Sequence, residues 1–342
     1  EVEKVIAPLV SDGQTTESTE EAQEEKDPLI PEIDTSVELQ AGSRVAVVSK
    51  STSGEFWGLV KKGMEQAIAD VNEAYGFKKE DQVTMTFEGA SDEKDVESQV
   101  NTIDAVIAEN PDVLCVSASD MDSLQAQLEA AKENGIPVVA FDSGVTDSKM
   151  VRAFRGTDNT RVGEIAAYRL ATAIGKMGKV AVFSAQEKTQ SIQERVSGFT
   201  NYITNYPDIE VVEIVYQDQV DDMTAAMQEV LDKYPQLDGV FCNNADIADL
   251  YLDMKKDETK DSIVMVGVDA TAKQQEAIRN SKEVGVVSQQ PYAMGYQTIW
   301  TALLTTAPKK SVEIKRNVRI DPAWIDSSNI DDPTYSSYLY AN

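Results

Sequence analysis

From Arg44 onward, hydrophobic and polar residues alternate along the chain in two distinct periods. Short apolar runs rich in β-branched residues are separated by longer segments in which apolar residues recur at helical spacing. Continuous apolar strands between helices are typical of a parallel sheet that helices cover on both faces. The predicted strands are 44–49, 83–89, 112–119, 137–144, 179–186, 209–217, 239–244, 263–270 and 285–290. They fall into two similar cycles, which predicts an α/β fold of two doubly wound parallel-sheet lobes.

The longer segments between these strands predict helices. One helix ends near Tyr75, and others lie near 93–109, 121–135, 160–175, 190–205, 223–233, 246–256, 272–281 and 292–306. The second group of alternating strands and helices contains one strand more than the first group before Gln289 is reached. We therefore expect the helix at 292–306 to return to the first lobe. We therefore expect two discontinuous lobes joined by crossovers at a hinge. Their predicted ranges are 43–157 with 290–317, and 158–289 with 318–342.

Residues 1–42 differ from the rest of the chain. They contain 12 acidic residues against Lys4 and Lys26, and they have no aromatic residue. A segment this polar cannot bury enough apolar surface to offset the entropy lost on ordering. We therefore expect a disordered acidic linker that packs on nothing. Because the chain starts at Glu1 and not at Met, we also expect a trimmed form, anchored as a lipoprotein through a cysteine upstream.

The composition narrows the possible classes of function. Lys and Arg total 31 against 59 Asp and Glu, and the net charge of −28 argues against nucleic acid or anionic membrane as a partner. No histidine is present, which excludes Ser-His-Asp and Cys-His catalysis and imidazole zinc sites. Cys115 and Cys242 lie in separate apolar runs and predict two buried thiols. We therefore expect no catalytic residues, no metal site and no cofactor.

Polar or small residues follow most of the predicted strands. These clusters are 49–51, 117–119, 142–144, 243–244, 269–271 and 288–290. In open α/β sheets, ligands bind outside the carboxyl ends of the strands. Clusters from both cycles therefore predict one shared binding site in a cleft between the two lobes.

Seven stretches in register resemble the type I periplasmic sugar-binding proteins of ABC transporters, most closely the ribose-binding branch. They are GEFW, IPVVAFDSG, RGTDNTRVGEIAAYRLA, SIQERVSGF, DGVFCNNADIA, IVMVGVDAT and GVVSQQPYAMG. The resemblance covers about 44–320. It implies a monomeric extracytoplasmic protein that captures a sugar or polyol between its lobes and delivers it to a membrane ABC permease.

The resemblance also implies a set of ligand contacts. Phe56 and Trp57 match the aromatic pair that stacks on the sugar ring. The polar contacts fall on Asp142, Ser143, Arg195, Asn244, Asp269 and Gln289. This chemistry suits a sugar, because an aromatic face covers its C–H face, while carboxylates, guanidinium and amides bind its hydroxyl groups.

The chain also departs from the ribose pattern. Ser143 stands where an arginine usually follows the first-lobe acid, and Gly54 replaces an asparagine of the first loop. Tyr216 is the nearest ring to a second-lobe position that often carries an aromatic residue. These departures imply a roomier and less cationic site, for a sugar or polyol other than ribose.

Each candidate residue also has a purely structural explanation. Trp57 belongs to an apolar helical stripe and could be core, and Arg195 follows Glu194 on a helix and could be a solvated charge. The aspartates could cap the segments that follow them, and the amides could satisfy loop backbone groups. The joint register with one family favours the binding role.

Three functions other than transport are possible for a chain of this fold. A sugar-responsive repressor shares this fold, but it should begin with a basic helix-turn-helix, whereas residues 1–42 are acidic. A sensory module that presents its ligand to a receptor cannot be separated from a transport protein by sequence. An enzyme that uses Asp142 and Asp269 as a carboxylate pair is the third alternative.

Overall fold

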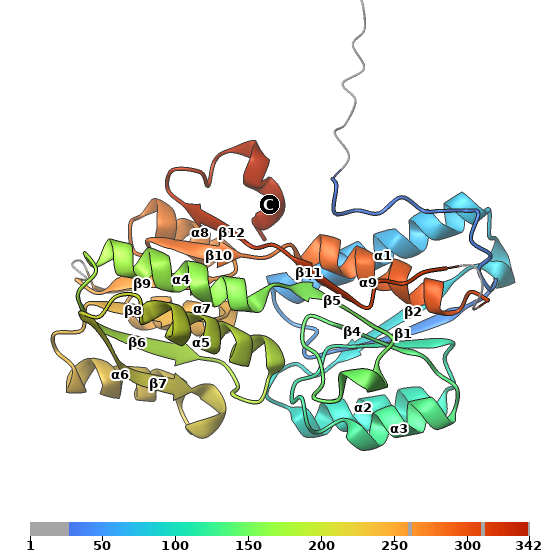
Figure 1. Ribbon diagram of the computed structural model, residues 1–342, viewed down its shortest axis with the longest axis horizontal. Helices are drawn as coiled ribbons and strands as arrows, with labels where there is room; N and C mark the ends of the chain where they lie inside the picture. The colour runs from blue at the N-terminus through green and yellow to red at the C-terminus, as the bar shows by residue number, and fades with distance from the viewer. Residues whose placement is uncertain (1–26, 259–261, 309–311, 341–342) are drawn as a thin grey trace, which may run out of the picture.

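The computed structural model describes residues 27–258, 262–308 and 312–340, and it shows two α/β lobes side by side (Figure 1). The first sheet has the strand order β11-β5-β4-β3-β1-β2, and its strands are parallel. Its strands are β1 (Arg44–Ser49), β2 (Thr84–Gly89), β3 (Val113–Val116), β4 (Val138–Phe141), β5 (Ala153–Thr157) and β11 (Asn317–Ile320).

The second sheet has the order β12-β10-β9-β8-β6-β7, in which only the edge strand β12 is antiparallel to its neighbour. Its strands are β6 (Gly178–Ser184), β7 (Ile209–Tyr216), β8 (Gly239–Cys242), β9 (Val264–Val268), β10 (Gly285–Ser288) and β12 (Ala323–Asp326). The predicted fold class of two parallel-sheet α/β lobes is confirmed.

Helices cover both faces of each sheet (Figure 1). The first lobe has α1 (Glu55–Tyr75), α2 (Val96–Ala108), α3 (Gln125–Glu133) and α9 (Pro291–Thr305). The second lobe has α4 (Asn159–Ala173), α5 (Gln190–Ile203), α6 (Met223–Lys233), α7 (Ala245–Met254) and α8 (Ala272–Arg279). In the first lobe, α1 and α9 share one apolar cluster with the sheet, while α2 and α3 share another on the opposite face. None of the described helices is long and apolar enough to cross a membrane.

Three strands were missed by the sequence pattern, and one of them corrects a predicted boundary. β5 contains the buried Arg155, whose guanidinium donates to the backbone oxygens of Phe154 and Lys315. β11 (NVRI) and β12 (AWID) mix polar with apolar residues, so neither forms a continuous apolar run. Because β11 pairs with β5, residues 318–320 belong to the first sheet and not to the second lobe, where the sequence had put them.

The expectation that residues 1–42 pack on nothing is wrong for residues 27–42. Val37 and Leu39 are buried in the apolar cluster of α1 and α9. The Tyr75 hydroxyl donates to the Val37 oxygen at 2.7 Å, and the Gln297 amide donates to the Leu29 oxygen at 2.7 Å. The average composition of the segment concealed the few apolar residues that cover this face. Residues 1–26, where the rest of the predicted linker falls, lie outside the described residues.

Cys115 and Cys242 are free and buried, as predicted. Burial raises the pKa of both thiols, and the Glu283 charge adds to the effect at Cys242. A thiol that stays protonated is a poor nucleophile. Both cysteines therefore serve as small apolar core residues.

Candidate functional site

A cavity of about 570 Å³ lies between the two lobes and is lined by residues from both. Seven of the eight predicted contacts line it: Phe56, Trp57, Asp142, Arg195, Asn244, Asp269 and Gln289. The eighth, Ser143, is fully buried beside Asp142 and does not line the cavity. The structure thus brings the predicted residues together; their role as ligand contacts stays a prediction.

The carboxyl ends of the parallel strands position the polar side chains of this cavity. Asp142 follows β4, Asn244 follows β8, Asp269 follows β9 and Gln289 follows β10. Asp142 and Asp269 have φ angles of 59° and 79°, in the left-handed region where short polar side chains are tolerated best. At both positions the backbone turns sharply as the strand ends, and the carboxylate lies at the carboxyl edge of the sheet.

A buried lysine accompanies Asp142, and the sequence analysis did not single it out. The Lys50 ammonium lies 3.0 Å from an Asp142 oxygen, 3.7 Å from a Glu93 oxygen and 3.2 Å from the Ser143 hydroxyl. Burial on its own lowers the pKa of Lys50, but the charges of Asp142 and Glu93 outweigh it, so the pKa is raised. The ammonium therefore stays charged and neutralises part of the acidic first-lobe wall.

The two aromatic residues are more buried than their predicted role suggested. Phe56 and Trp57 are 9% and 3% exposed, and both belong to the apolar cluster under α1. Their rings meet edge to face with centroids 5.0 Å apart, and the Trp57 indole donates to a Glu93 oxygen at 2.7 Å. Neighbouring rings and side chains cover most of the surface of each ring, and their stacking on a sugar stays a prediction. Both still line the cavity.

Arg195 is held inside the second lobe by close packing of two helices. A Cβ on Gly163 of α4 would lie 2.2 Å from the Arg195 backbone oxygen, so only glycine permits this approach. The guanidinium donates to the Asn159 side chain at 2.9 Å and to the Asn243 oxygen at 2.8 Å. Arg195 is 3% exposed, which rules out a solvated surface charge. Its Nη2 has no hydrogen-bond partner in the described part of the chain, and the side chain lines the cavity.

Asp269 and Gln289 form one network with the crossover between the lobes. The Gln289 amide donates to Asp269 Oδ1 at 2.7 Å and accepts from the Thr157 hydroxyl at 2.7 Å. The Asp269 Oδ2 accepts from the backbone nitrogen of Ala245 at 2.9 Å. Asn244 meanwhile caps α7, because its Oδ1 accepts from the backbone nitrogen of Ile247. These side chains thus have structural partners and still reach the cavity.

The second-lobe wall of the cavity is acidic. Asp246 and Asp249 line it from α7, and Asp253 lines it from the same helix. Surrounding protein atoms desolvate Asp246 and raise its pKa to about 7, with the charges of Glu93 and Asp269 adding to the shift. The side chain remains accessible from the cavity, so protein encloses it without sealing it from water. Asp246 is therefore only about half ionised near pH 7, so the like-charge repulsion that disfavours an anionic ligand comes mainly from the other carboxylates that line the cavity.

Hydrogen bonds join the two lobes across the cleft. Ser143 Oγ lies 2.7 Å from Ser191 Oγ, and the Gly144 nitrogen donates to the Gln190 side chain at 2.6 Å. On another side of the cavity, a Glu55 oxygen accepts from the Ala272 nitrogen at 2.9 Å. Ser143 therefore connects the lobes, which is a different position from the one that the sequence suggested.

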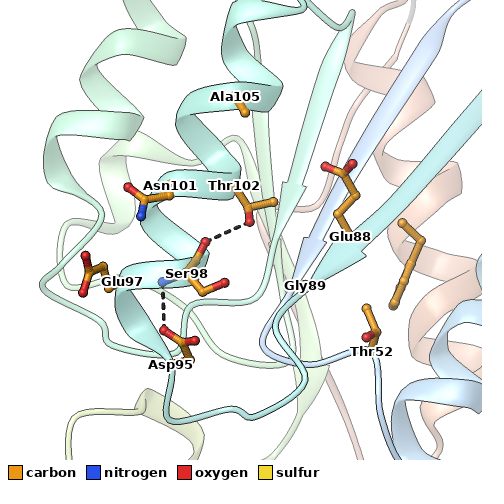
Figure 2. A pocket seen from close by; sticks show the side chains of 10 residues that line it. Thr52, Glu88, Gly89, Asp95, Glu97, Ser98, Asn101, Thr102 and Ala105 are labelled. Carbon is orange, nitrogen blue, oxygen red and sulfur yellow. Dashed lines mark hydrogen bonds between the residues drawn. The ribbon is translucent and has the colours of Figure 1, made fainter.

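A larger hollow of about 840 Å³ lies on the first lobe alone, between β2 and α2. Figure 2 shows Asp95, Ser98 and Thr102 along the helix, with Glu88 across from them. Asp95 caps α2 by accepting from the Ser98 nitrogen, and the Thr102 hydroxyl donates to the Ser98 oxygen. The hollow contains none of the predicted contacts, and two of its polar side chains, Asp95 and Thr102, bond to the backbone of α2. The cavity between the lobes is therefore the candidate site.

Known proteins share this architecture. The chain is 27% identical to the ribose import binding protein of Bacillus subtilis over 203 residues, which is 59% of this chain and 66% of that relative. The match thus spans about two thirds of the length of the relative. A solute-binding protein from Agrobacterium vitis with bound D-fucose superposes with a TM-score of 0.79 at 28% identity, covering 87% of this chain and 100% of that one.

A second solved structure and a family model agree with these matches. A carbohydrate transporter solute-binding protein from Agrobacterium radiobacter in complex with D-arabinose has a TM-score of 0.78 at 28% identity, with 87% of this chain and 99% of that chain covered. The model of the periplasmic binding protein domain matches residues 45–307. That match includes both sheets apart from β11, β12 and the first residue of β1. The chain therefore belongs to the periplasmic binding protein family.

Proposed function

We propose that the protein is an extracytoplasmic solute-binding protein that captures a neutral monosaccharide or related polyol between its lobes. The observation that carries the proposal is the lining of the cavity, which combines carboxylates, a guanidinium, amides and aromatic rings from both lobes. Hydroxyl groups both donate and accept, so this mixture suits a polyhydroxylated ligand. The volume of the cavity, about 570 Å³, lies within the range of ~300–1,000 Å³ that small-molecule sites occupy.

The relatives support a sugar as the ligand, and the electrostatics supports a neutral one. Solved relatives hold D-fucose and D-arabinose, and a curated relative is a ribose import binding protein. Lys50 and Arg195 are outnumbered by acidic side chains around the cavity. An anionic sugar would meet that excess of negative charge, whereas a neutral sugar would not.

Transport is the proposed use of this binding. The ligand would contact both lobes and so favour the arrangement in which they touch, and a membrane ABC permease would recognise that arrangement. We further propose a monomer with no catalytic activity, tethered to the cell surface by a lipid anchor upstream of Glu1. The lobes would be 43–157 with 290–320, and 158–289 with 321–340, moving about the crossovers between them.

Isothermal titration calorimetry tests the proposal directly. The sugars to titrate are D-ribose, D-allose, D-arabinose, D-tagatose and D-fucose, with native mass spectrometry of the purified protein to detect any retained ligand. A bound sugar at a hundredfold over its Kd should stabilise the fold by about 2.7 kcal/mol, visible as a higher Tm. If no sugar of the panel binds and none is retained, the proposed function is wrong.

Arg195→Ala tests the proposed contacts. Removing charged hydrogen bonds to the sugar should weaken binding by about 1.5–3 kcal/mol. The matched control is Arg161→Ala, because Arg161 lies on the neighbouring helix α4 with its side chain 56% exposed and paired with Glu164. The control should bind as wild type does. If Arg195→Ala also retains the wild-type Kd, Arg195 is structural only.

A further inference from the structure

The C-terminal segment returns to the junction of the two lobes. After β12 it forms the short 3-10 helix η4 (Pro333–Tyr338) and ends, within the described residues, at Tyr340. In Figure 1 this red segment lies above β12, near the junction of the two lobes. The Tyr340 nitrogen donates to the Ala270 oxygen at 3.1 Å, which fixes the segment to the end of β9.

The side chain of Tyr340 contacts both lobes. It is 4% exposed, and its ring belongs to the apolar cluster of the first lobe, with its centroid 6.0 Å from that of Phe56. Its hydroxyl donates to Asp269 Oδ1 at 2.8 Å and accepts from the Gln289 nitrogen at 3.3 Å, both in the second lobe. One side chain thus contacts three residues of the candidate site without lining the cavity itself.

The hydroxyl completes the set of donors around the Asp269 carboxylate. Oδ1 accepts from Tyr340 and from the Gln289 amide, and Oδ2 accepts from the Ala245 nitrogen. Burial and the negative charge of Asp269 raise the pKa of Tyr340 well above its ordinary value, so the phenol stays protonated and remains a donor. Without it, the carboxylate would lose one of the bonds that fix its orientation at a left-handed backbone position.

We propose that Tyr340 is a positioning residue of the ligand site: its hydroxyl orients Asp269 and Gln289 while its ring supports Phe56. The inference rests on the proposed function, since these three residues are proposed sugar contacts. A site is precise only when neighbouring groups lock the side chains that line it. The C-terminal segment is therefore part of the binding apparatus, although none of its residues up to Tyr340 lines the cavity.

Tyr340→Phe tests this role because it keeps the ring and removes only the hydroxyl. Without the hydroxyl, Asp269 is less well ordered in the free protein and must be ordered when the sugar binds. Calorimetry with the five sugars of the panel should therefore show a Kd raised by up to about tenfold, which corresponds to about 1.4 kcal/mol. Tyr335→Phe is the matched control, because it makes the same change in η4 at a half-buried ring. It should leave the Kd within about twofold of wild type.

A double-mutant cycle separates positioning from a general loss of stability. Tyr340→Phe and Asp269→Asn act on one hydrogen bond, so their effects on the Kd should not multiply. Tyr340→Phe and Asp142→Asn share no hydrogen-bond partner, so their effects should multiply to within about twofold. Multiplicative effects in both pairs would overturn the positioning role.

The outcomes also distinguish this inference from the proposed function. If wild type binds a sugar, Arg195→Ala weakens it and Tyr340→Phe does not, then the inference about Tyr340 alone is overturned. If wild type binds none of the five sugars and native mass spectrometry detects no retained ligand, the proposed function falls, and the inference falls with it.

Discussion

Replacing Lys50 with methionine should destabilise the first lobe. The change keeps an apolar stem of similar length and removes the ammonium that lies 3.0 Å from Asp142, a carboxylate only 3% exposed. Removing one partner of a buried ion pair costs about 3–5 kcal/mol, because the other charge stays buried. Asp142 keeps contacts with the hydroxyls of Ser117 at 2.7 Å and Ser143 at 3.1 Å. We therefore expect the low end of that range, about 3 kcal/mol of unfolding free energy.

Urea unfolding at about pH 7 measures this loss as a lower midpoint at an unchanged slope. Lys61→Met is the matched control, because Lys61 pairs with Glu65 at 3.7 Å with both side chains about half exposed, and it should cost no more than about 0.5 kcal/mol. Adding Asp142→Asn to Lys50→Met should recover part of the stability, since the neutral amide needs no cation. An unchanged midpoint for Lys50→Met would refute the view that this ion pair supports the fold.

Two further predictions concern a buried carboxyl group and the N-terminal segment. Burial raises the pKa of Glu283 well above its ordinary value, with the Asp249 charge adding to the effect and the Gln274 hydrogen bond opposing it. The stability that protonated Glu283 contributes is present below the unfolded pKa and is lost as pH rises through the folded pKa. The Tm of Glu283→Gln should therefore exceed that of wild type at about pH 8, and the difference in Tm should be smaller at about pH 5. A difference in Tm that stays constant across this range would contradict the raised pKa. Deleting residues 1–42 should lower the Tm, whereas deleting residues 1–26 should not. The reason is that segment 27–42 buries two side chains, each worth up to ~1.5–3 kcal/mol before the entropy of ordering is subtracted. Equal Tm values for the two deletions would mean that segment 27–42 adds no stability.

Elements with a local signature could be predicted from the sequence, and elements that depend on distant pairing could not. The nine predicted strands are all present, because each is a short segment rich in apolar or β-branched residues between amphipathic helices. β11 carries Asn317 and Arg319 and becomes a strand only by pairing with β5, far back in the chain. The segment 27–42 was misjudged for the same reason, since its burial depends on α9 at the other end of the chain.

The candidate site divides in a similar way. Polar residues at strand ends predict a shared cleft, because the carboxyl ends of parallel strands meet at one edge. Lys50 lies in one of those clusters, but its importance depends on Asp142, 92 positions later, and no local pattern marks a lysine for burial. Tyr340 follows a polar segment without period, so only the folded chain reveals that its hydroxyl reaches Asp269.

The structural and functional explanations of a site residue are not exclusive, and Trp57 shows why. Its ring packs against Phe56 and Phe141 and its indole nitrogen is bonded to Glu93, as a core residue requires. A wall that must accept a ligand without losing conformational entropy has to be rigid beforehand, and rigidity comes from that same packing. Arg195 is a second example. Two hydrogen bonds inside the lobe hold its Nε and Nη1, and because the guanidinium is planar they also fix the direction of Nη2. Burial of a predicted contact is therefore an argument for preorganisation, and an alanine at such a position should lower stability and affinity together.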